Sequence, residues 1–166
     1  MSTIRQTQAI VPSLLDRLID DDPTSLDETN EPTSQQINKL KNNIRRDLEN
    51  LLNTRLRIDR DLKKFPELNK SLLNYGLPDF SHIPIESDSE HNLLANKIYT
   101  LIYWFEPRLI NVNVEVEAMG DGFNRNLHVE ISATLLVEPN PIPVLFDSQM
   151  QHIDRKLSIR ELKHGR

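Results

Sequence analysis

Apolar and polar positions follow a helical spacing in the first two thirds of the chain. Over residues 37–55, apolar side chains recur every three or four positions, which predicts a helix with one apolar face. The same spacing over residues 87–105 predicts a second long helix. The two inward faces consist of Ile37, Leu40, Ile44, Leu48, Leu51 and Leu52, and of Leu94, Ile98, Leu101, Ile102 and Phe105.

Local signals mark where these helices begin and end. A shorter helix is expected over residues 65–80, entered through Pro66 and ended by Gly76 in a left-handed conformation. The long helices are expected to be capped by Thr33 or Ser34, and by a capping box of Ser87 and Glu90.

The period changes to two after the second long helix. Alternating apolar and polar residues over 112–118 and 127–137, separated by a turn with two glycines at 119–124, predict an antiparallel hairpin with one wet face. The proline-rich stretch 138–143 breaks the second strand. Residues 144–153 are then expected to form a third strand or an extended arm.

Helices first and strands afterwards is the order of an α+β fold. We expect N-terminal helices packed on one face of a small antiparallel β-sheet, a meander. The predicted organisation is a short helix and acidic linker (1–36), an α+β domain (37–153) and a basic C-terminal tail (154–166) that forms at most a weak helix.

The N-terminal segment contains a short amphipathic piece, residues 12–20, started by Pro12 or Ser13. Leu14, Leu15, Leu18 and Ile19 share one side of it. An acidic stretch rich in Pro, Ser and Thr follows over residues 20–36 and is typical of a linker. A small apolar helix before such a linker either docks into the groove of another protein or folds back on its own core. The sequence leaves both readings open.

Composition narrows the class of protein. Hydrophobic residues make up 37% of the 166 residues, which fits one ordered core plus a loosely held polar segment. Without cysteine, the chain has no disulfide, thiolate zinc site or cysteine nucleophile. The first 22 residues do not read as a signal peptide, and no run of 18 apolar residues occurs. We expect a cytosolic chain with no direct membrane insertion.

Charge is unevenly distributed along the chain, whose formal net charge is −5. Residues 1–38 carry −5 and residues 79–138 carry −7, whereas residues 39–70 carry +5 and residues 151–166 carry +3. Such blocks are either solvated faces or surfaces that dock against other charged proteins. Because the basic block is interleaved with acids and the whole chain is acidic, nucleic acid is not an expected partner.

The sequence contains no recognisable catalytic or ligand-binding pattern. The chain has four glycines and no phosphate-binding loop, no nucleophile elbow, and no two histidines at a helical spacing of three or four, so no cofactor or metal is expected. A glycosidase needs two carboxylates across a sugar-sized cleft. The candidates are Glu106, Glu115, Glu117 and Glu130. Glu115 and Glu117 read as the wet face of a strand, so we predict no catalytic residue.

The joint between the second long helix and the first strand carries an acid, a proline and a base. Pro107 ends the helix because it lacks an N–H and disfavours helical geometry at Glu106. Glu106 faces the negative end of the helix dipole, and its charge needs a cation if the corner is also partly buried. Either Glu106 and Arg108 pair with each other and pin the corner, or both point outward and bind another protein. We favour the second reading, which requires that Arg108→Ala leave the monomer folded.

These residues resemble a known family. "FEPRL" at 105–109 is similar to the Glu-Pro-Arg signature of the baseplate wedge family of contractile injection machines. Further segments resemble its type VI secretion branch, the TssE proteins: "PSLLDRLIDDDP" (12–23), "RRDLENLLNTR" (45–55), "SLLNYGLPDF" (71–80) and "EPNPIPVLFDSQM" (138–150). The resemblance covers nearly the whole chain, except residues 24–36 and the last dozen.

The resemblance implies a non-enzymatic structural subunit of the cytoplasmic baseplate, at the inner-membrane face, that joins wedge proteins to the contractile sheath. Its implied partners are the wedge proteins TssF and TssG, met through Glu106, Pro107 and Arg108, and the sheath proteins, met on the sheet side. We also expect Leu14, Leu15 and Leu18 to contact another protein. The third strand is expected to leave an edge free for strand addition.

Two alternatives remain from the sequence. The family is often labelled lysozyme-like, so a peptidoglycan hydrolase is the main alternative. A cytosolic adaptor of another pathway is the second. A cell-wall hydrolysis assay separates the first from a wedge subunit, and neighbouring genes for a sheath and wedge proteins separate the second.

Overall fold

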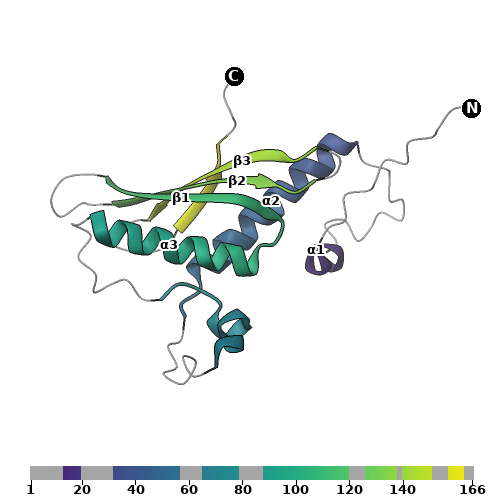
Figure 1. Cartoon of the computed structure of the whole chain (residues 1–166). Coiled ribbons are helices and arrows are strands. Elements are labelled where there is room, and N and C mark those ends of the chain that lie inside the picture. The colour runs from purple at the N-terminus through teal and green to yellow at the C-terminus, as the bar shows by residue number, and fades with distance from the viewer. Residues whose placement is uncertain are drawn as a thin grey trace, which may run out of the picture.

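The structure, a computed structural model, describes residues 13–19, 32–56, 65–78, 88–119, 126–137, 140–150 and 157–162. It confirms the α+β fold, with helices packed against a four-stranded antiparallel sheet (Figure 1). The elements are α1 (Leu14–Leu18), α2 (Thr33–Asn53), η2 (Pro66–Lys70), η3 (Leu72–Asn74), α3 (Asp88–Phe105), β1 (Leu109–Met119), β2 (Asn126–Leu135), β3 (Ile142–Met150) and β4 (Leu157–Glu161).

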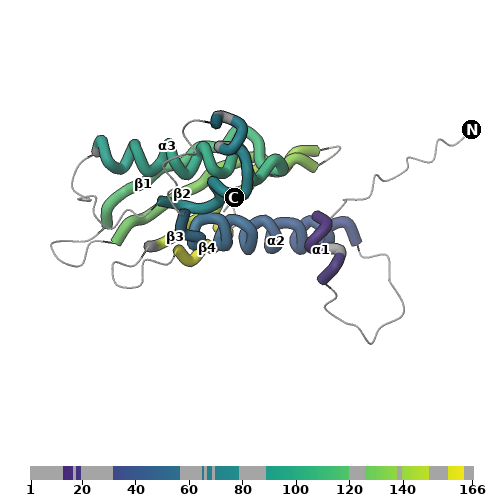
Figure 2. The backbone as a smooth tube through the Cα atoms, turned by 90° about the horizontal axis from the view of Figure 1, so that it is seen from below, coloured from purple at the N-terminus to yellow at the C-terminus, as the bar shows by residue number. Residues whose placement is uncertain are grey.

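The core lies between the sheet and the two long helices. Viewed from the helix side, α2 and α3 run across the same face of the sheet, α3 along β1 and α2 along β4 (Figure 2). The expected inward faces are confirmed by the buried side chains of Leu40, Ile44, Leu48, Leu51 and Leu52 in α2 and of Leu94, Ile98, Leu101 and Ile102 in α3, whereas Ile37 is half-buried. Phe105 is only partly buried, with its ring edge-on to Tyr75. The inner face of the sheet adds Val129, Ile131, Leu135, Phe146 and Ile159.

The strands form a meander in the order β1-β2-β3-β4. Alternation places the side chains of Leu127, Val129, Ile131, Ala133 and Leu135 in the core and those between them on the wet face, as predicted. The pairing of β1 with β2 shifts register between Ile110 and Asn113, where Asn111 has φ 51. Asparagine adopts this left-handed conformation more readily than most residues. A register shift of this kind bends a strand, here at the start of β1 next to the corner.

The last strand corrects two expectations. Residues 157–161 were expected to belong to a tail with at most a weak helix, but they form β4. Leu157 and Ile159, both buried, alternate with exposed Ser158 and Arg160, and this period of two explains why the segment forms a strand and not a helix. β4 pairs with β3 from Phe146 to Met150, so the edge of β3 that we expected to be free is occupied over that length.

Two helical boundaries also differ from expectation. α2 begins at Thr33 with Pro32 in the N-cap position and no side-chain cap, so neither Thr33 nor Ser34 caps it. The expected helix over 65–80 is instead two short 3₁₀ segments, η2 and η3, interrupted at Ser71. Ser87 of the expected capping box, most of the linker over 20–36 and most of the turn over 119–124 lie outside the described residues.

Gly76 closes this region onto the end of α2. Its φ of +109 confirms the positive backbone angle expected of it. The turn allows Leu77 N to donate to Thr54 O at 2.9 Å and Leu56 N to donate to Leu77 O at 2.8 Å.

No helix in the described part of the chain is both long enough and apolar enough to cross a membrane.

Candidate interaction site at the helix–strand corner

The corner between α3 and β1 is built by the backbone of Glu106 and Pro107. Glu106 N makes the last helical bond, to Ile102 O at 2.8 Å, and Glu106 O accepts from Leu109 N at 3.1 Å. Pro107 between them has no N–H to continue the helix. The chain therefore turns within three residues, and the predicted role of Pro107 in ending the helix is confirmed.

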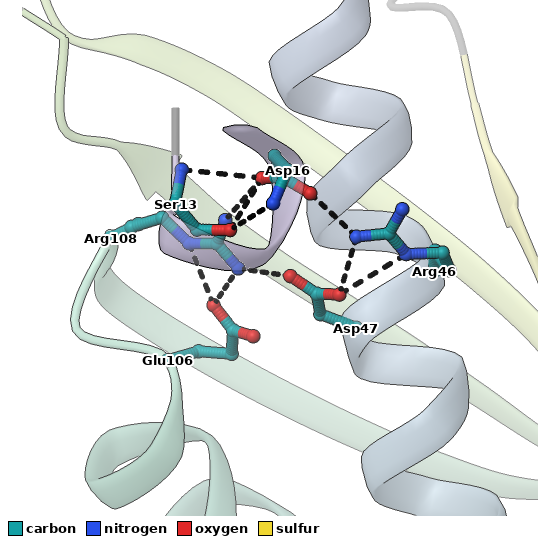
Figure 3. Close-up of polar contacts among 6 residues, drawn as sticks. All are labelled: Ser13, Asp16, Arg46, Asp47, Glu106 and Arg108. Atoms are coloured by element: carbon teal, nitrogen blue, oxygen red, sulfur yellow. Dashed lines mark hydrogen bonds and ion pairs between the residues drawn. The ribbon is translucent and has the colours of Figure 1, made fainter. Parts of the chain in front are cut away.

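The two charges of the corner pair with each other. Arg108 donates to one oxygen of Glu106, Oε2, from Nε at 3.0 Å and from Nη2 at 2.7 Å (Figure 3). Glu106 is only 5% exposed, whereas Pro107 is exposed and the side chain of Arg108 is 24% exposed. The structure thus confirms the internal pair. The carboxyl of Glu106 points into the domain, which corrects the expected outward orientation, and its role as a contact to another protein stays a prediction.

Burial controls the protonation of Glu106. Removal from water raises the pKa of its carboxyl above the ordinary value, and the guanidinium of Arg108 offsets this only in part. The carboxylates of Asp47 and Asp16 raise it further. Keeping Glu106 charged in the folded chain therefore costs free energy. The corner can be both folded and charged only because Arg108 pairs with Glu106.

A second set of charges extends the corner to α2. Arg108 Nη2 also donates to Asp47 Oδ2 at 2.7 Å, and Asp47 Oδ1 accepts from Arg46 Nη2 at 3.2 Å. Arg46 Nη2 in turn donates to Asp16 Oδ1 of α1 at 2.6 Å. Glu106, Arg108, Asp47, Arg46 and Asp16 form one chain of alternating charge across three elements (Figure 3).

Asp16 has its side chain only 2% exposed although it belongs to a surface helix. Its burial raises the pKa of the carboxyl, but hydrogen bonds from Ser13 and Arg46 together outweigh burial, and the pKa lies below its ordinary value. Asp16 therefore stays ionised and paired at neutral pH.

The leucines of α1 point away from the domain. Leu14 is 79% exposed and Leu18 is 82% exposed, and Leu15 and Ile19 are exposed as well. Ser13 starts the helix as expected, through a capping box with Asp16. Each of the two readings for this segment holds for one side of the helix. The polar side is bound to the rest of the chain, and the apolar side remains exposed. The role of Leu14, Leu15, Leu18, Pro107 and Arg108 as contacts to another protein stays a prediction.

The arrangement does not suit hydrolysis of a sugar. Glu106 and Asp47 both accept from the same nitrogen of Arg108, so a guanidinium lies where a glycosidase needs its substrate. Glu115 and Glu130 are opposite each other on the wet face of the sheet, and Glu117 is opposite His128, which pairs with Asp147. Among the described residues, no three His, Asp or Glu side chains gather closely enough to hold a metal ion.

A comparison with protein families decides the classification. The family model described as baseplate wedge protein gp25 matches residues 38–140, more than half of the chain. The chain belongs to the baseplate wedge protein gp25 family. The matched range spans most of α2, all of α3, β1 and β2, and the corner between α3 and β1. The comparison with curated proteins and the comparison with solved structures each gave no match.

Sequence reasoning about this family member found the corner but missed Asp16, Arg46 and Asp47. Asp47 lies next to buried Leu48, so an acid at the edge of an apolar helix face signalled that a cation had to be nearby. Asp16 stands among leucines in α1, and its partner is 30 residues away in sequence. No local spacing connects the two, which is why the pattern alone could not pair them.

Proposed function

We propose that this chain is a non-enzymatic structural subunit of a type VI secretion baseplate, which joins the wedge proteins TssF and TssG to the contractile sheath at the cytoplasmic face of the inner membrane. The observation that carries the proposal is the match to the baseplate wedge family across the corner and both long helices. A structural role in a baseplate is what that family supports, and the particular machine and partners are our proposal.

The corner supports a contact with the wedge proteins through its exposed part. Pro107 and the exposed fraction of Arg108 face solvent, while Glu106 and Asp47 hold the guanidinium from behind. Because Nε and Nη2 are engaged and Nη1 is buried, the surface that the corner offers to another protein consists of Pro107 and the exposed fraction of the Arg108 side chain, held in a fixed position. Glu106 then acts from within the domain, by setting the position of Arg108.

The sheet supports a contact with the sheath through its outer strands. In the described sheet β1 and β4 are the terminal strands, so each has one edge without a neighbouring strand. A strand from a sheath subunit can add to such an edge by backbone hydrogen bonds. Because β4 covers part of β3, this proposal replaces the one that placed the sheath on β3.

Co-purification tests the assignment to a wedge. The TssF–TssG pair encoded in the same genome should be retained by the wild-type chain and lost by Leu18→Asp, which puts a charge on the exposed face of α1. Leu93→Asp, at an exposed leucine of α3, is the matched control and should still bind. Failure of the wild-type chain to retain the pair, at micromolar concentration and low salt, would contradict the proposal.

A peptidoglycan hydrolase is the second candidate, favoured by one observation. The raised pKa of Glu106 is a property of general acids in glycosidases. Release of dye from labelled cell wall, abolished by Glu106→Gln, would establish it. We expect no release above that of a boiled sample, because Arg108 occupies the space beside the carboxyl.

A further inference from the structure

The amphipathic helix α1 is arranged opposite to one that folds onto its own core. Its apolar residues are exposed, with Leu14 at 79% and Leu18 at 82%, whereas the side chain of its acid, Asp16, is only 2% exposed. A helix that packs on a core buries its apolar stripe. Burial of leucines therefore does not hold α1 in place, and something else must.

One carboxylate holds α1 by both of its oxygens. Asp16 Oδ2 accepts from Ser13 Oγ at 2.7 Å and from Ser13 N at 3.3 Å, and Asp16 N donates to Ser13 Oγ at 3.2 Å, which closes the first turn. Asp16 Oδ1 accepts from Arg46 Nη2 at 2.6 Å, which ties that turn to α2. A five-residue helix is too short to persist alone in water, so this tie decides whether α1 is ordered.

The tie also places α1 over the corner. Arg46 is held by Asp47, and Asp47 is held by Arg108. The position of α1 therefore depends on the same residues that fix the corner. Arg108 Nη1 is buried with no hydrogen-bond partner, 3.8 Å from Asp16 Oδ2. The leucine face of α1 is thus presented at a fixed place and orientation relative to the corner.

We propose that Asp16 is a positioning residue that presents α1 as a preformed docking helix. The partner surface that receives α1 is an apolar groove with a basic rim on the wedge pair. The inference therefore rests on the proposed function. The exposed leucines require an apolar groove. The run Asp20, Asp21 and Asp22, which follows α1 directly in the sequence, requires bases at its rim. Because the leucines already face outward, the partner binds without displacing α1.

Preforming the helix lowers the entropy lost on binding, and loss of the tie should weaken binding without removing a contact. Asp16→Asn keeps the size and an acceptor for Ser13 but removes the charge that binds Arg46. We expect its affinity for the purified TssF–TssG pair, measured by titration calorimetry with the full chain, to fall about tenfold, a coupling of ordinary size. Glu49→Gln breaks the exposed pair with Arg45 on α2 and is the matched control, with unchanged affinity.

Hydrogen exchange separates positioning from general structure. In the free Asp16→Asn chain, the amides of residues 16–19 should exchange faster, with the thermal midpoint of the domain unchanged. In the complex, protection of the same amides should match the wild type, because the partner then orders α1.

The sign of the affinity change decides the inference. Tighter binding by Asp16→Asn would show that α1 must leave the corner, and unchanged binding would show that the tie does nothing, so either result overturns positioning. In both cases the proposed function stands if Leu18→Asp abolishes binding. If Leu18→Asp binds normally, the docking role of α1 itself is wrong. If the isolated chain dimerises in sedimentation and Leu18→Asp makes it monomeric, the occupant is a second copy, and the inference fails.

Discussion

Arg108 Nη2 lies 2.7 Å from Asp47 Oδ2, and this bond joins the start of the sheet to the middle of α2 across 61 residues of sequence. The same nitrogen lies 2.7 Å from Glu106 Oε2. One guanidinium thus pairs with two carboxylates, one from the corner and one from α2, and holds the point at which α3 gives way to β1 against α2. The corner is first a structural joint, and any contact it makes with another protein uses the surface that this joint leaves exposed.

Removal of Arg108 should destabilise the domain. Arg108→Ala leaves the buried carboxylate of Glu106 without a cation, and breaking a buried ion pair in this way costs about 3–5 kcal/mol. Urea unfolding followed by circular dichroism measures the loss. Arg45→Ala, at an exposed pair with Glu49, is the control and should cost less than about 1 kcal/mol. An Arg108→Ala chain as stable as the wild type would show that the corner carries no structural load, as the outward-pointing reading requires.

Protonation of Glu106 should appear in the pH dependence of stability. Because its pKa is raised in the folded chain, the folded state binds this proton more tightly than the unfolded state. The resulting stability is full below the ordinary pKa of glutamate and is lost as pH rises through the folded pKa. Glu106→Gln keeps an acceptor for Arg108 and cannot titrate. The free energy of unfolding of the wild type, minus that of this variant, should therefore fall as pH rises above the ordinary pKa of glutamate, about 4.3.

The opposite slope would contradict this account of the corner. A difference that grows as pH rises would mean that pairing with Arg108 outweighs burial and that the pKa of Glu106 is lowered. Asp16, whose pKa is lowered, contributes stability of that opposite kind, present above its ordinary pKa and lost as pH falls through the folded pKa. Measuring Asp16→Asn alongside Glu106→Gln therefore gives an internal reference for the sign.

The fold was largely accessible from the sequence because its signals are periodic and local. The spacing from Leu40 to Leu52 and the alternation from Leu127 to Leu135 each report a face that the structure buries. β4 was missed because Leu157 and Ile159 give only two apolar positions in a basic segment, and β3 supplies the rest of the strand's stability by pairing. A five-residue strand has too few positions to display its period.

The site was accessible only in part, because charge pairing in space has no period in sequence. The adjacency of Glu106 and Arg108 made their pair one of two possible readings, and the prediction of contact with another protein followed from the other. What decides between them is Asp47, 61 residues away from Arg108 in the sequence, and the cover provided by α1. Sequence separation of that size becomes contact only through the packing of α3, α2 and β1.

Gly76 should not tolerate a side chain. A Cβ at this position would lie 2.4 Å from the carbonyl oxygen of Thr54, a backbone atom, and φ +109 is strained for any other residue. We expect Gly76→Ala to cost at least about 1–3 kcal/mol in thermal or urea unfolding. Asn111→Gly is the matched control, since Asn111 is exposed with φ 51, and it should change stability by less than about 0.5 kcal/mol. Equal effects of the two variants would contradict the steric explanation.

β4 should contribute to the core as much as the strands that the sequence pattern predicted. Ile159 is 1% exposed and packs on the α2 side of the sheet, so Ile159→Ala should lower the free energy of unfolding by about 2–5 kcal/mol. Ser158, its exposed neighbour on the opposite face, provides the control, because Ser158→Ala keeps the backbone pairing with Gln149 and should stay within about 0.5 kcal/mol. If residues 157–161 formed a weak helix or an unattached tail instead, neither variant would change the free energy of unfolding. A large loss for Ile159→Ala alone requires that β4 close the sheet, and with it that the edge of β3 from Phe146 onward be closed to a strand from the sheath.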